Sequence, residues 1–295
     1  TVDEEKLPEG FSAFNFVVKG LTGGHSGDDI NKNRANANKL LVRFLLEQCE
    51  KTDLRLCDIQ AGGLHNAIPR EAHATVAVPM AYAATFVTEL EAFVAKVREE
   101  FSVTEPDLTA ALEAVDAAST CICPEQAVRM LKSLSVVHNG IFAMSQDLEG
   151  LVETSSNLAS VRKQGNQVVA TTSQRSSVAS NLEYMAAVVR SAFELGGAKC
   201  VTNEGYPGWK MNPKSEILKV CVESYKRLFG KEPLVRAIHA GLECGLFSEK
   251  YPNLDMVSFG PTLRGVHSPD ERLLIPTVQM VWDHLLDVLK NIPAK

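Results

Sequence analysis

The feature that most constrains the fold is a glycine- and proline-rich segment at residues 204–213, Glu-Gly-Tyr-Pro-Gly-Trp-Lys-Met-Asn-Pro. Helices and strands both stop at such a segment, because proline lacks a backbone donor and glycine loses the most freedom on ordering. The order of expected elements also changes there. A chain of 295 residues is long enough for two domains of ~150 residues each, and the sequence predicts them at residues 1–204 and 205–295.

Before this boundary, the pattern predicts two loosely similar α+β halves at residues 10–100 and 120–200. Alternating apolar residues indicate strands, and apolar residues at helical spacing indicate amphipathic helices. We expect strands at residues 11–19, 54–61, 72–78, 151–161 and 167–175, and helices at residues 33–50, 86–97, 124–135 and 178–193. Residues 102–118 are mixed and acidic, so they predict only a connection. The expected class is a two-layer α+β domain.

After the boundary, short apolar strands are expected to alternate with helices. We expect helices at residues 215–229, 241–249 and 276–290, and strands at residues 234–238 and 255–259. Ser215 suits the start of the first helix and Gly230 its end. This alternation is typical of a parallel α/β layer. Two strands are too few for such a sheet, so this domain should use strands from elsewhere in a larger chain.

The composition argues against two classes of partner. The net charge is -6 and the isoelectric point is about 5.7, whereas nucleic-acid-binding domains are usually basic. No apolar run approaches the ~20 residues that a membrane helix requires. Seven scattered cysteines are typical of a reducing compartment. We therefore expect a cytoplasmic protein that binds neither nucleic acid nor a membrane.

Two histidines lie on expected loops, where chemistry is often found. His25 lies among four glycines in residues 20–27, which should leave its ring accessible, although it could equally be a hydrogen-bonded turn residue. His267 follows the expected strand at residues 255–259 and precedes two carboxylates. Its imidazole could ligate a metal if its other nitrogen is held by a carbonyl or carboxylate. The alternative is a surface turn.

Two charged residues are further candidates. Arg175 ends an expected strand, and its planar guanidinium suits a carboxylate ligand; the alternative is a salt bridge at the sheet edge. Glu243, in the segment His239-Ala-Gly-Leu-Glu-Cys-Gly245, could be a base, a cap or the partner of another site residue. The alternative for Glu243 is a solvated carboxylate at a helix terminus.

Six short motifs occur along the chain. They are Gly23-Gly-His-Ser-Gly27, Gly63-Leu-His-Asn-Ala-Ile-Pro69, Thr154-Ser-Ser-Asn-Leu158, Tyr206-Pro-Gly-Trp209, His239-Ala-Gly-Leu-Glu-Cys-Gly245 and His267-Ser-Pro-Asp-Glu271. In this order they resemble the M20 metallopeptidase family, and within it the aminoacyl-histidine dipeptidase branch, over nearly the whole chain. The resemblance implies an α/β catalytic domain split by an inserted lid. Residues 1–204 would be the lid, or dimerisation, domain, and residues 205–295 the C-terminal part of the zinc-peptidase catalytic domain.

The resemblance also implies roles for three lid residues. His25 matches a histidine that reaches a partner subunit's active site and stabilises the oxyanion. Arg175 matches the arginine that holds the substrate's carboxylate, and Asn66 matches a polar contact to the substrate. A homodimer formed through the lid is the expected assembly.

In the C-terminal part, the resemblance implies one metal ligand and a substrate loop. His267 matches the single metal-ligating histidine of this part, and His239 and Glu243 lie in a loop of the substrate pocket. The family's other ligands come from a His-x-Asp motif, a Glu-Glu pair and a further Asp, none of which this chain matches. We therefore expect a fragment that is inactive alone.

The activity that the resemblance implies is hydrolysis of dipeptides, of the Xaa-His type or of broad specificity, at a site with two zinc ions. Two alternatives stay open. One is a non-catalytic dimerisation or binding module, and the other is an M20 aminoacylase or deacetylase. The strings Tyr-Pro-Gly-Trp and Gly-Leu-Glu-Cys-Gly favour the dipeptidase branch over the second alternative.

Overall fold

The structure is a computed structural model, and it describes residues 1–116, 118–146, 148–203, 205, 208–209, 212, 214–236, 243–264 and 271–293. The chain divides into two compact units. The first comprises Thr1–Ser176 and Ser180–Asn203, and the second comprises Ser177–Ala179 and Glu204–Lys295. Helices and strands occur together in the chain, as the predicted mixed α and β class requires.

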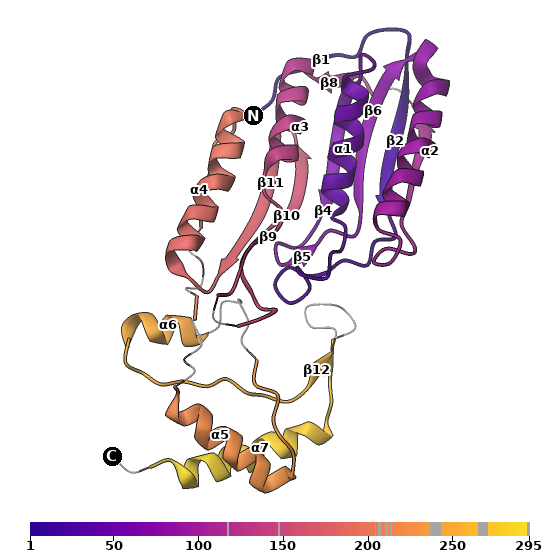
Figure 1. Cartoon of the computed structure of the whole chain (residues 1–295). Helices are drawn as coiled ribbons and strands as arrows, with labels where there is room; N and C mark the ends of the chain where they lie inside the picture. The colour runs from indigo at the N-terminus through magenta and orange to yellow at the C-terminus, as the bar shows by residue number, and fades with distance from the viewer. Residues whose placement is uncertain are drawn as a thin grey trace. The chain divides into compact units, whose positions relative to one another are not determined.

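The first unit is built on an antiparallel sheet with helices α1 to α4 along one face (Figure 1). Its strands are β1 (Glu4–Lys6), β2 (Phe11–Lys19), β3 (Gly24–His25), β4 (Arg55–Gly62), β5 (Ala67–Ile68), β6 (Ala72–Pro79), β7 (Thr109–Val115), β8 (Thr120–Ile122), β9 (Gly140–Met144), β10 (Val152–Gln164) and β11 (Gln167–Ser176). Its helices are α1 (Ala37–Cys49), the short 3-10 helix η1 (Met80–Tyr82), α2 (Ala83–Glu100), α3 (Pro124–Val136) and α4 (Ala179–Leu195). The main sheet runs β11-β10-β4-β6-β2-β7, with β9 beside β10, and β1–β8 and β3–β5 form two separate pairs.

The alternation along β2 decides which face of the sheet meets the helices. Phe14, Phe16 and Val18 are buried in the main hydrophobic cluster, because successive side chains of a strand point to opposite faces. The Phe16 ring packs on the Phe44 ring of α1 with centroids 4.9 Å apart. The Phe44 ring in turn lies 5.2 Å from the Phe93 ring of α2. The core therefore lies between the sheet and its helices.

The two halves of this unit each place strands between two helices, in the order α1-β4-β5-β6-η1-α2 and α3-β9-β10-β11-α4. They join where β4 pairs antiparallel with β10 and where α1 packs against α3. Lys39 of α1 reinforces the second contact. Its Nζ donates to the carbonyls of Leu134 and Ser135 at 2.8 and 2.9 Å and to that of Val137. One sheet thus spans both halves.

Several strands of this unit were not predicted. Residues 109–115, expected to be part of a connection, form β7, which pairs with β2 along its length. The polar segment of β1 pairs with the short β8. The β9 strand, of five residues, pairs with β10. These strands form because a neighbouring strand offers backbone partners, which local sequence patterns do not report.

The second unit is mainly helical in its described part. Its elements are α5 (Glu216–Phe229), α6 (Glu243–Lys250), β12 (Leu263–Arg264), β13 (Arg272–Leu273) and α7 (Pro276–Asn291). The α5 helix begins as predicted, since Ser215 Oγ accepts the Leu218 amide at 3.1 Å, and it ends at Gly230 with φ +63°. The ring of His284 on α7 is hydrogen-bonded to the Cys221 carbonyl at 2.9 Å, which ties α7 to α5.

The predicted strand at residues 255–259 is wrong, because these residues have no regular structure. Asp255 instead accepts the Ile217 amide at 3.0 Å and so caps α5. Residues 234–236 of the other predicted strand also lack regular structure, and its residues 237–238 lie outside the described part. A strand needs a neighbour to pair its backbone groups, and the described residues of this unit offer none to either segment.

Candidate functional site

The predicted site residue His25 lies on a two-stranded ribbon at one end of the first unit. The strand β3 pairs with β5 so that His25 stands opposite Ala67. The Ser26 amide donates to the Asn66 carbonyl at 2.8 Å. The predicted pair His25 and Asn66 is therefore brought together by this ribbon, although 40 residues of chain separate them.

The loop that follows β3 is held by Asp29. Its Oδ2 accepts the His25 amide at 2.8 Å and lies 3.4 Å from Arg34 Nη1, while its Oδ1 pairs with Lys32. Burial raises the pKa of the Asp29 carboxyl, but the hydrogen bonds from Lys32 and the His25 amide and the charge of Arg34 outweigh burial and lower it. A Cβ at Gly24 would lie 2.2 Å from Arg34 Nη1. Gly24 also has φ +138°, which residues with a side chain rarely adopt, so the backbone here favours glycine beside His25.

The backbone determines the tautomer of the His25 ring. Its Nδ1 accepts the amides of Gly27 and Asp28 at 3.3 and 3.2 Å. A nitrogen that accepts cannot carry the proton of a neutral imidazole, so this geometry favours the proton on Nε2. The Asp28 carboxylate lies 3.9 Å from Nδ1 and is 63% exposed, whereas the His25 side chain is 17% exposed. The ring is thus largely buried beside an exposed carboxylate.

Arg175 lies near the end of β11, opposite Ser155 of β10, and it is close to the His25 ring. A Cβ built on Gly27 would meet His25 Cε1 at 3.1 Å and Arg175 Cδ at 3.6 Å. The two side chains therefore both flank Gly27. They come from different halves of the first unit, and the joint between β4 and β10 is what brings the halves into one body.

The Arg175 side chain is half-buried, and one of its donors lacks a partner in the described part of the chain. Its Nε is buried and has no hydrogen-bond partner among the described residues. Burial lowers the pKa of Arg175 from its ordinary value, and the charge of Asp28 raises it again in part. A buried donor without an acceptor is costly, and a guanidinium prefers a carboxylate as its partner. The arrangement can bind an anion beside the proton donor of His25.

The remaining predicted site residues are Glu243, His239 and His267. Glu243 is the first residue of α6 in the second unit and is exposed, where a carboxylate suits the positive end of a helix. His239 and His267 lie outside the described residues. Within the described part of the chain, no group of three or more His, Cys, Asp or Glu side chains could hold a metal ion. The described residues by themselves therefore do not form a zinc centre.

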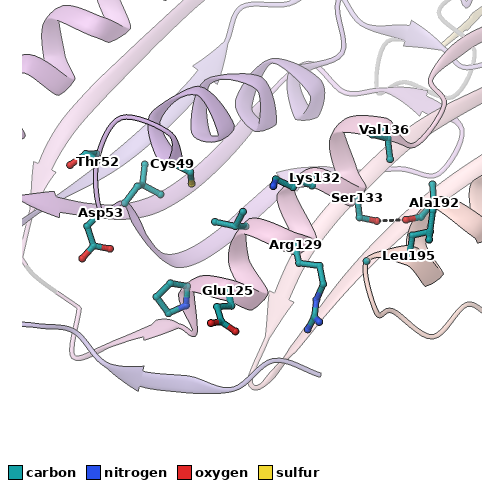
Figure 2. A pocket seen from close by; sticks show the side chains of 14 residues that line it. Cys49, Thr52, Asp53, Glu125, Arg129, Lys132, Ser133, Val136, Ala192 and Leu195 are labelled. Atoms are coloured by element: carbon teal, nitrogen blue, oxygen red, sulfur yellow. Dashed lines mark hydrogen bonds between the residues drawn. The ribbon is translucent and has the colours of Figure 1, made fainter.

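A cavity of about 720 Å³ lies elsewhere in the first unit, between the ends of α1 and α4 and the length of α3 (Figure 2). At one wall of this cavity a hydrogen bond joins α3 to α4, because Ser133 Oγ donates to the Ala192 carbonyl at 2.8 Å. Its lining includes Cys49, Arg129 and Lys132. None of the predicted site residues lines it.

Sequence reasoning gave no role to Asp28, or to Asn157 within the motif of residues 154–158. Asp28 directly follows the sequence His-Ser-Gly. This position could have identified Asp28, because the turn brings the amides of Gly27 and Asp28 to the His25 ring. Asn157 is 1% exposed in a strand whose next residues are Leu158 and Ala159. A buried asparagine needs hydrogen-bond partners, and the sequence could not identify them.

No helix in the described part of the chain has the length and apolar character needed to cross a membrane.

Comparison with known proteins identifies a family model and two similar proteins. Residues 16–105 match the family model M20_dimer, the peptidase dimerisation domain.

Two relatives match the whole chain. The cytosol non-specific dipeptidase of Escherichia coli (strain K12) is 40% identical over 294 residues, which are 100% of this chain and 61% of that protein. The crystal structure of the aminoacylhistidine dipeptidase from Vibrio alginolyticus matches with a TM-score of 0.88 and 39% identity, covering 100% of this chain and 60% of that one. The chain therefore spans less than two thirds of the length of either relative.

Proposed function

This chain belongs to the M20 peptidase family, as its motifs predicted, and on that premise we propose that it is part of a metal-dependent dipeptidase. Residues 1–204 would be the lid, or dimerisation, domain and residues 205–295 part of the catalytic domain. The names of the two relatives support dipeptides as substrates, of the Xaa-His type or of broader range. The word cytosol in the name of one relative supports a cytoplasmic location.

The observation that carries this proposal is the meeting of His25 and Arg175 at Gly27. In a dipeptide, the free carboxylate is bonded to the α-carbon that carries the scissile amide nitrogen. A site for it must therefore place a cation for the carboxylate close to a hydrogen-bond donor for the carbonyl oxygen. Arg175 supplies the cation, and Nε2 of His25 supplies the donor.

We assign the steps of the proposed reaction that this chain's residues perform. Arg175 binds the terminal carboxylate and so limits the substrate's length. His25 donates from Nε2 to the scissile oxygen as negative charge develops there, which stabilises the transition state more than the ground state. Asn66, on the same ribbon, contacts the substrate backbone. Lid closure over the bound dipeptide excludes water.

The metal is expected from the family, with two zinc ions in the complete site. His267 is the ligand that this chain would contribute. His239 and Glu243 would line the substrate pocket in the same part of the chain. The remaining ligands would come from the part of the relatives that this chain does not cover.

The proposal is tested by comparing this chain with the complete protein. We expect the complete protein with zinc to hydrolyse dipeptides, and its His267→Ala variant to lose activity while keeping its far-UV circular dichroism. We expect the 295-residue chain alone to bind no stoichiometric zinc by calorimetry and to hydrolyse no dipeptide. Tight one-to-one zinc binding or turnover by the chain alone would contradict the assignment. Turnover of acylated amino acids in place of dipeptides would favour the aminoacylase alternative.

A further inference from the structure

The two halves of the first unit are joined near the candidate site by buried asparagines. Asn36, which caps the start of α1, directs its Nδ2 to the Leu158 carbonyl at 3.0 Å and to Asn139 Oδ1 at 2.9 Å. Asn139 Oδ1 also accepts the Leu158 amide at 2.9 Å. This network ties the first half to β10 and to the residue before β9 in the second half.

Asn157 extends the network to the ribbon that carries His25. Its Nδ2 donates to the Ala67 carbonyl at 2.8 Å, and Ala67 is the residue that faces His25 across the ribbon. Its Oδ1 lies 3.4 Å from Asn36 Nδ2. Asn157 belongs to β10, which pairs with β11, the strand of Arg175. One buried side chain therefore connects the strands that present the two site residues.

The ribbon needs such a connection. β3 and β5 pair over two residues each, and an isolated pair of short strands is only marginally stable in water. Asp29 holds the His25 end through the loop. Two contacts link the ribbon to the second half, where Arg175 lies: the hydrogen bond from Asn157 to the Ala67 carbonyl and the buried apolar cluster that contains Ile68 and Val152. The hydrogen bond is the directional one of the two.

We propose that Asn157 is a positioning residue that sets the distance between His25 and Arg175. This inference rests on the proposed function, because it concerns the geometry of the same site. Asn157 touches no substrate in this account and acts through the ribbon. An asparagine suits the task because its amide donates to Ala67 while its carbonyl faces Asn36, which no apolar side chain of similar size can do.

The first test measures the ribbon itself by amide hydrogen exchange in the complete protein. In Asn157→Ala, the Ser26 amide, which is bonded to Asn66, should exchange at least ~10-fold faster because the ribbon opens locally. The matched control is Asn38→Ala. Asn38 is also fully buried and donates to the Leu158 carbonyl at 3.0 Å, but it has no bond to the ribbon. The control should leave exchange at Ser26 unchanged, and equal acceleration in both variants would overturn the proposal.

The second test measures the site through dipeptide hydrolysis. Asn157→Ala should lower kcat/KM by ~10- to 100-fold, the scale expected for a misplaced catalytic donor, and Asn38→Ala should leave it near wild type. In the double variant Asn157→Ala, His25→Ala, the losses should not multiply, because His25 is the group being positioned. Multiplying losses, or wild-type activity in Asn157→Ala, would contradict a positioning role.

A further variant covers the case in which Asn157→Ala does not fold. Asn157→Ser keeps a hydroxyl in the buried network and adds no charge, but its side chain is too short to reach the Ala67 carbonyl. It should reproduce both effects, and a wild-type exchange rate at Ser26 would overturn the proposal. If the wild-type protein hydrolyses no dipeptide, the proposed function fails, while the exchange result still decides whether Asn157 holds the ribbon.

Discussion

Gly27 separates the two side chains on which the site depends. Its backbone lacks the positive φ that would require glycine, yet an added methyl group would lie 3.1 Å from His25 Cε1 and 3.6 Å from Arg175 Cδ. Contacts of 3.0 to 3.4 Å are tighter than most real Cβ contacts, so the imidazole would have to move by a few tenths of an ångström. Glycine at this position therefore serves the arrangement of the site.

Gly27→Ala should reduce activity and leave stability nearly unchanged. We expect kcat to fall by about 10-fold, since displacements well under 1 Å matter for catalytic groups, and the melting temperature to stay near that of the wild type. Gly63→Ala is the control, because a Cβ at Gly63 meets nothing within 4 Å. Steady-state kinetics and calorimetry on both variants check this. An equal loss of kcat in the two variants would contradict the account.

Residue type and motif suggested His25, Asn66 and Arg175 as site residues, and their roles stay predictions. The structure places His25 and Arg175 on either side of Gly27 and joins Asn66 to Ser26, the residue after His25. Their proximity could not be predicted, because it depends on the pairing of β4 with β10, whose residues are about 100 positions apart. The role of Asp28 beside the His25 ring depends on a tight turn that glycine-rich sequence indicates only in general.

Among the helices, the contact between α1 and α3 depends on a buried charge. Lys39 points into the end of α3 and donates to three carbonyls there. These are the carbonyls left without partners at a helix C-terminus, where a cation is favoured. Burial lowers the pKa of Lys39 from 10.5 to about 8. The joint between the halves therefore contains a group that titrates near physiological pH.

The pH dependence of stability should reveal this group. Its pKa is lower in the folded protein than in the unfolded chain, so between about 8 and 10.5 the unfolded state binds more protons. The contribution of Lys39 to the free energy of unfolding should then rise with pH across that window and be constant below it. Denaturant titrations of wild type and Lys39→Met at several pH values give the difference. A difference that is flat or falls between pH 8 and 10 would contradict the assignment.

The helices and the five strands predicted in the first unit lie close to their predicted bounds, whereas short or weakly alternating strands were missed. Apolar residues at helical spacing located α1 to α5 and α7 in the regions where they occur, because an amphipathic stripe is a local property. The strand β7 was missed because its residues, Thr-Ala-Ala-Leu-Glu-Ala-Val, show little alternation and follow an acidic stretch. Residues 255–259 have a strand-like pattern but no neighbouring strand in the described part, so they form none.

At the scale of the whole molecule, the second unit exposes large apolar side chains. Within its described residues these include Leu234 at 74%, Ile275 at 78%, Trp282 at 55% and Leu289 at 58% exposure. Trp282 and Leu289 both lie on α7, and apolar side chains exposed together usually mark a surface that meets a partner. This agrees with the proposal that the complete catalytic domain includes chain that the relatives have beyond the matched region.

The dimerisation domain at residues 16–105 supports a homodimer of the complete protein. Residues 60–62 of β4 already pair with β10 of the same chain, so this part of the strand is not available to a second copy. We expect a dimer in sedimentation equilibrium of the complete protein. A single monomeric species up to the highest attainable concentration would count against lid-mediated assembly.

The central claim is that Arg175 binds the carboxylate of a dipeptide while His25 faces its scissile carbonyl. The most direct measurement compares kcat/KM for a dipeptide and for the same dipeptide with a C-terminal carboxamide, using the complete protein and its Arg175→Ala variant. Truncating one partner of a buried charge pair costs about 2–5 kcal/mol, so the wild type should prefer the free carboxylate by roughly 30-fold or more. In Arg175→Ala this preference should fall to about one. An unchanged preference in the variant would contradict the account.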